Sequence, residues 1–149
     1  MSEQTRRWVR GGLIYLTVSF LGVGLWATFS ARSFYEDFPG GGRHWLAGDG
    51  PYNAHLVSDA GFGFLAIGTV LLLAAVWMER RVVQAALAAA IVHSGLHLLF
   101  HLRHPNDDLS AADALMSNGG IALGALLALA LLVTINRTPA RRGREDVRV

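Results

Sequence analysis

The chain alternates between long uncharged apolar runs and short polar stretches that hold most of its charge. The apolar runs predict helices at about residues 11–31, 56–78, 82–103 and 111–136. Each run is long enough to cross roughly 30 Å of hydrocarbon at about 1.5 Å rise per residue. The backbone must satisfy its own hydrogen bonds in lipid, and the runs do not alternate like barrel strands. The pattern therefore predicts an all-α membrane protein, an antiparallel four-transmembrane-helix bundle that forms a single domain over residues 1–149.

Composition agrees with this prediction. Of the 149 residues, 52% are hydrophobic and only 16% are charged, whereas charged residues make up about 25% of a typical soluble domain. The chain has no cysteine, so thiolate metal ligands and covalent haem attachment are excluded. Any metal ion would have to use nitrogen and oxygen ligands.

The basic residues are distributed unevenly between the two ends of the predicted bundle. All thirteen are arginines, and ten lie on the side of the termini if the helices alternate in direction. These ten are Arg6, Arg7, Arg10, Arg80, Arg81, Arg137, Arg141, Arg142, Arg144 and Arg148. The positive-inside rule then places both termini in the cytoplasm, with an extracytoplasmic loop at 32–55 and a basic cytoplasmic tail at 137–149. The expected location is the cytoplasmic membrane. Anionic lipid next to the arginines explains the basic balance without a nucleic-acid partner.

The third apolar run carries a stripe of histidines. His93, His97, His101 and His104 fall within an arc of about 80° at roughly 100° per residue. Small residues on the same side are Ala86, Ala89 and Ala90, whereas Leu87, Ile91, Leu98 and Leu102 lie opposite. Because ionisable groups in a bilayer almost always face the bundle interior, we expect the histidines inside and the large aliphatic side chains against lipid.

A second polar pair lies at the start of the second helix, where His55 and Asp59 are four residues apart. The short turn at 79–81 predicts an antiparallel hairpin of the second and third helices. Such a hairpin brings this pair level with His97 and His101. The four side chains then form a predicted site for a divalent transition metal such as zinc, iron or copper.

Two other interpretations of these residues stay open. His93 and His97 are candidate cofactor-binding residues, and a b-type haem held by two imidazoles from different helices is a possible cofactor. Alternatively, the deeper histidines are neutral and hydrogen-bonded to a neighbouring helix. In that case Asp59 only caps its helix or pairs with Arg103.

Smaller signals refine the expected helix ends and packing. Asn53 is a plausible N-cap for the second helix, and Ser110 with Asp113 resembles a capping box for the fourth. Gly120 and Gly124 form a GxxxG pattern, for which we expect close packing within the molecule rather than a dimer seam.

The polar segments resemble a group of four-span membrane proteins common in actinobacteria and loosely similar to the DoxX-like superfamily. The resemblance covers about residues 12–133 and rests on SFY, FP and the pattern PYN-x-HL-x-x-D-x-G. The matching residues are Ser33, Phe34, Tyr35, Phe38, Pro39, Pro51, Tyr52, Asn53, His55, Leu56, Asp59 and Gly61. It implies a four-span fold, and DoxX relatives are linked to membrane redox and quinone-associated roles.

Three functional classes follow from this pattern. The first is an accessory or interaction protein that binds a membrane protein partner or forms a homo-oligomer. The second is a metal- or haem-binding membrane redox protein, and the third is a small-solute or proton carrier. The sequence leaves open whether the chain catalyses a reaction.

Overall fold

The structure, a computed structural model, describes residues 2–48 and 50–138. The helices are α1 (Glu3–Phe29), α2 (Ala31–Asp37), α3 (Ala54–Trp77), α4 (Arg80–Arg103) and α5 (Ala111–Arg137). Two short antiparallel strands, β1 (Pro39–Gly40) and β2 (Arg43–His44), lie between α2 and α3. Among the described residues, four helices are long and apolar enough to cross a membrane, namely α1, α3, α4 and α5. The prediction of an all-α bundle with four membrane-length helices is confirmed.

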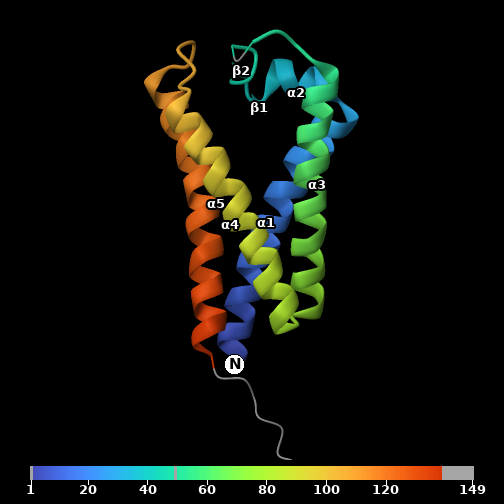
Figure 1. The fold of residues 1–149 in the computed structure, drawn as a ribbon, viewed down its shortest axis with the longest axis vertical. Helices are drawn as coiled ribbons and strands as arrows, with labels where there is room; N and C mark the ends of the chain where they lie inside the picture. Colours follow the sequence, from blue (N-terminus) through green and yellow to red (C-terminus); the bar gives the residue numbers. More distant parts are fainter. Residues whose placement is uncertain (1, 49, 139–149) are drawn as a thin grey trace, which may run out of the picture.

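We call the two ends of the bundle the terminal end and the loop end. The terminal end holds the start of α1, the turn between α3 and α4, and the end of α5 (Figure 1). The loop end holds α2, the two strands and the loop between α4 and α5. The part of the predicted tail at 139–149 lies outside the described residues.

Helix caps explain where the elements begin. Asn53 accepts a hydrogen bond from the Leu56 amide, and Ser110 accepts one from the Asp113 amide, so both predicted caps are confirmed. The helix α1 begins at Glu3 rather than at residue 11, because Ser2 caps it. Hydropathy marked only the apolar part of this helix.

The turn between α3 and α4 differs from the prediction by about two residues. Met78 adopts the left-handed conformation (φ 53°) and closes α3, and α4 already begins at Arg80. The predicted turn residues 80 and 81 are therefore helical. The connection still forces α3 and α4 to run in opposite directions.

The main cluster of buried apolar side chains lies in the half of the bundle next to the terminal end, and Ala27 and Phe34 are buried apart from it toward the loop end. The main cluster is built from apolar side chains of all four long helices. They are Val9, Leu13, Leu16 and Phe20 of α1, Leu71, Ala74 and Ala75 of α3, Val83, Ala86, Leu87 and Ala90 of α4, and Ala128, Leu131 and Ile135 of α5. Burial of these side chains supplies the main attraction between the helices in this half, through close van der Waals packing.

Toward the loop end the long helices separate into two pairs. Figure 1 shows α1 with α3 diverging from α4 with α5. Glycines make the contact between α1 and α3 close: a Cβ on Gly24 would lie 2.8 Å from the Leu65 amide nitrogen, and one on Gly61 would lie 2.9 Å from the Thr28 amide nitrogen. The hairpin of α3 and α4 is therefore packed at its turn and open at its far end.

The expected close packing at the GxxxG pattern of α5 is wrong. A Cβ on Gly120 or Gly124 would meet no atom of the described chain within 4 Å. The close glycine contacts of the long helices fall instead between α1 and α3 at Gly24, Gly61 and Gly68, and between α1 and α5 at Gly12, where the sequence has no GxxxG pattern. Glycine spacing within one helix does not show which face a neighbouring helix will cover.

Polar side chains at the terminal end satisfy carbonyl groups at helix ends. Arg10 of α1 donates to the Ala75 carbonyl at 3.1 Å, and Arg80 of α4 donates to the Thr138 carbonyl at 2.6 Å. Gln84 also donates to the Asn136 side chain at 2.6 Å. Because the last carbonyls of a helix lack partners within it, these side chains join neighbouring helices at the terminal end.

Candidate functional site

The histidines of α4 form a line that runs from the centre of the bundle to the loop end. His93 is the deepest and lies between the two helix pairs, with ring centroids 5.4 Å from Phe20 of α1 and 4.7 Å from Phe64 of α3. Its Nε2 is buried and has no hydrogen-bond partner among the described residues. The predicted inward orientation of His93 is confirmed, but no neighbouring helix supplies the expected hydrogen bond to Nε2.

His97 and His101 form a pair one turn further along α4. Their Nε2 atoms lie 3.1 Å apart, and their ring centroids 4.7 Å apart. Both side chains are half-buried. The last histidine of the stripe, His104, is exposed, stacks on Phe100 and contacts the Phe100 carbonyl through Nδ1, so it does not belong to the pair.

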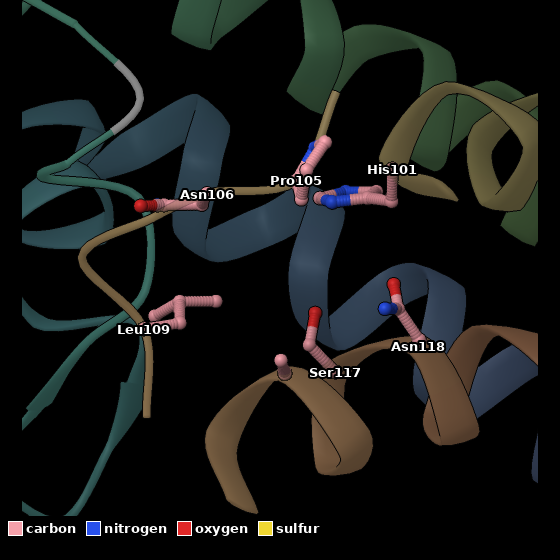
Figure 2. Close-up of a pocket in the computed structure, with 7 residues that line it drawn as sticks. His101, Pro105, Asn106, Leu109, Ser117 and Asn118 are labelled. Carbon is pink, nitrogen blue, oxygen red and sulfur yellow. The ribbon is translucent and has the colours of Figure 1, made fainter. Parts of the chain in front are cut away.

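A small pocket opens beside His101 at the loop end. It is lined by His101, Pro105, Asn106, Leu109, Ala114, Ser117 and Asn118, and about 40 Å³ of it is open to water-sized molecules. Figure 2 shows Ser117 and Asn118 pointing from α5 toward the His101 side. The Oδ1 of Asn118 is buried and accepts no hydrogen bond from the part of the chain that the structure describes. The pocket therefore offers polar atoms to a ligand of a few atoms.

A loop ties the two diverging helix pairs together next to this pocket. Trp45, which follows β2, donates through Nε1 to Asp113 of α5 at 3.0 Å, and Arg43 forms an ion pair with the same carboxylate at 2.9 Å. Asn106, a pocket residue, donates to the Trp45 carbonyl at 3.2 Å. The segment at 43–48, which we call the strap, thus links the α2 side of the open end to α5 and to the loop between α4 and α5.

His55 and Asp59 form a separate pair at the start of α3. The His55 Nε2 lies 3.3 Å from the Asp59 carboxylate, with 82% and 50% of the two side chains exposed. Among the described residues, no group of three or more His, Cys, Asp or Glu side chains is close enough to hold a metal ion. The structure therefore does not bring this pair together with His97 and His101.

The divergence of α3 from α4 is the physical reason for this separation. Equal distances from the turn place Asp59 and His101 at similar heights, but α3 packs along α1 and leans away from α4 at the loop end (Figure 1). Asp59 contacts His55 instead of Arg103.

The expected division of α4 into a small inner face and a large lipid face is correct only in part. Ala86 and Ala90 are buried and Leu102 is exposed, as predicted. Leu87 is fully buried, however, and Ala89 is exposed. The buried face is centred between the histidine side and the leucine side of the helix, because α4 packs mainly against α5 rather than against α3.

The donor set fits a small ion better than a haem. The rings of His93 and His97 come from one helix and are stacked face to face with centroids 5.8 Å apart, so they cannot bind one iron from opposite faces of a macrocycle. The pocket is also far smaller than the roughly 300–1,000 Å³ of a typical cofactor site. His97 and His101, in contrast, already direct two nitrogens toward one another.

Sequence reasoning missed the residues that α5 and the strap contribute. Ser117 and Asn118 belong to a helix with no ionisable cluster, and Trp45 lies in a loop without regular structure. The one available signal is that Asn118 is a polar residue inside an apolar run, where polar groups are expected to have a function or a partner.

No protein-family model, curated protein or solved structure matches the chain. The similarity to DoxX-like and actinobacterial four-span proteins therefore stays an expectation from the sequence. Any functional conclusion has to rest on the geometry of the chain itself.

Proposed function

We propose that the protein is an accessory protein of the cytoplasmic membrane that binds a small polar ligand from the extracytoplasmic side. The ligand site is the pair of His97 and His101 with the adjoining pocket. The observation that carries this proposal is the uneven division of the bundle. The histidine pair and the pocket lie toward the loop end, and the core of the opposite half is apolar.

The orientation follows from the arginines. The terminal end includes Arg6, Arg7, Arg10, Arg80 and Arg81, and these residues favour the cytoplasmic face under the positive-inside rule. The loop end then faces outward. A ligand would reach His101 from the extracytoplasmic solution, past the strap.

The apolar core favours a binding role over a carrier role. Between His93 and the terminal end, Leu16 and Leu71 pack in the core of the bundle, and both are fully buried. A charged solute or proton would have to cross this layer without a polar partner, which is costly in a medium of low polarity. The histidine line therefore ends inside the protein rather than leading across it.

Proton flux into proteoliposomes tests this choice. The vesicles would contain a pH-sensitive dye and would be driven by an imposed membrane potential, with a protonophore as the positive control. We expect equal flux for the native protein, the His97→Ala variant and empty vesicles. A flux that the native protein supports and His97→Ala abolishes would establish a carrier and refute the proposal.

The accessory role rests on how little chain lies outside the spanning helices. Apart from α2 and the strap, the described loops are short and cannot form a separate domain. Purification in a mild detergent should retain a membrane protein partner or a second copy of the chain. A monomer that copurifies with nothing under these conditions would argue against an accessory role.

A further inference from the structure

We infer that His97 and His101 are the two imidazole ligands of a divalent transition-metal ion bound at the loop end. This inference rests on the proposed outward-opening site and names the ligand class for it. It replaces the predicted four-residue ligand set, since His55 and Asp59 lie elsewhere.

The distance between the two nitrogens carries the inference. An imidazole nitrogen binds zinc at about 2.0–2.1 Å, so two such ligands of one tetrahedral ion lie about 3.3 Å apart. The Nε2 atoms of His97 and His101 lie 3.1 Å apart. The observed separation is therefore within a few tenths of an ångström of the distance between two nitrogens that bind one ion.

The surroundings of the pair suit a cation. His101 lies in the last turn of α4, where the negative end of the helix dipole favours positive charge. Asn118, whose buried Oδ1 has no hydrogen-bond partner within residues 2–48 and 50–138, lines the same pocket and supplies an oxygen ligand. The pocket has room for water molecules, which can complete the coordination of a divalent ion.

A neutral hydrogen bond between the two imidazoles is the competing explanation. That bond would use one nitrogen of each ring and would need no ligand, but it would leave the Asn118 oxygen buried and unpaired. An unpaired buried acceptor costs about 1–3 kcal/mol. Water or a metal ion in the pocket relieves this cost, and titration with a metal ion separates the two explanations.

Titration of the full chain with Cu²⁺ in detergent tests the inference, because copper binds most tightly in the usual order of divalent ions. Electron paramagnetic resonance of the native protein should show coupling to two imidazole nitrogens at one equivalent of Cu²⁺. His97→Ala and His101→Ala should each weaken binding by more than about 100-fold. Loss of a side chain that only orients a metal ligand already costs about 10- to 100-fold.

His104→Ala is the matched control, because His104 lies on the same helix but is exposed and outside the pair. We expect its affinity for Cu²⁺ to equal that of the native protein. His55→Ala tests whether the exposed pair of His55 and Asp59 on α3 binds Cu²⁺ instead, and it too should leave the two-imidazole signal intact. Circular dichroism would confirm that each variant is folded.

The inference is overturned if the native protein shows no two-nitrogen signal, or if His55→Ala rather than His101→Ala removes it. The first result would leave the proposed outward-opening site standing with a different ligand. Cysteine labelling of the pocket, which needs no metal, reports on that site separately.

Discussion

The close contact between α1 and α3 can be tested by adding one methyl group at Gly24. A Cβ at this position would lie 2.8 Å from the backbone nitrogen of Leu65 and 3.1 Å from the carbonyl oxygen of Gly61. Backbone atoms cannot rotate out of the way as a side chain can. Gly24→Ala must therefore push the two helices apart.

Two effects of opposite sign determine the magnitude. Alanine favours a helix over glycine by up to about 1 kcal/mol, whereas overpacking of a well-packed contact costs about 1–3 kcal/mol. Gly124→Ala is the matched control, since its Cβ would meet no described atom within 4 Å. The propensity effect is common to both variants, so Gly24→Ala should be less stable than Gly124→Ala by about 1–3 kcal/mol.

Equilibrium unfolding in mixed micelles, followed by circular dichroism, measures this difference. Gly95→Ala, which is also free of contacts within 4 Å, provides a second control. Equal stability of all three variants would refute the close packing of α1 on α3. A loss of stability in Gly124→Ala alone would show that α5, not α1, makes the close glycine contact.

Three further outcomes are expected. Asp113→Asn removes the charge that holds Arg43 of the strap, so trypsin should cleave after Arg43 faster than in the native protein or in the control Asp107→Asn. An unchanged rate of cleavage would show that Asp113 does not hold the strap in place. His93→Phe removes a buried nitrogen that has no partner among the described residues, so it should raise the free energy of unfolding by about 1 kcal/mol. If His93→Phe instead lowers the free energy of unfolding as much as His93→Ala does, the nitrogen has a hydrogen-bond partner. A reporter active only outside the cytoplasm should be silent when fused to the C-terminus, and strong activity there would reverse the orientation.

The helices could be predicted from the sequence because their cause is local. Hydropathy and caps placed α3, α4 and α5 within two residues of their observed bounds, since an apolar run in lipid has no alternative to helix. The start of α1 was missed because Ser2 extends that helix beyond its apolar part. A local signal existed there, but it lay outside the hydrophobic pattern.

The pairing of the helices could not be predicted in the same way. The short turn at Met78 fixes the direction of α3 and α4 but not the angle between them. That angle depends on Gly24 and Gly61, which allow α3 to approach α1 closely. It also depends on the small buried face of α4 that packs on α5. These contacts join residues far apart in the sequence, so the predicted meeting of Asp59 with His101 failed while the local pair of His97 and His101 was found.

An outward-opening histidine site above a closed apolar core is tested most directly by single-cysteine labelling, since the native chain has no cysteine. Ser117→Cys lies in the pocket, Ala90→Cys in the core and Gly95→Cys on an exposed face of α4. A membrane-impermeant maleimide should label Ser117→Cys from the extracytoplasmic side only. It should not label Ala90→Cys from either side, because this position is buried in the core. It should not label Gly95→Cys either, because we expect this exposed face of α4 to contact lipid rather than water. Labelling of Ser117→Cys from the cytoplasmic side, or of Ala90→Cys from any side, would contradict the proposed site.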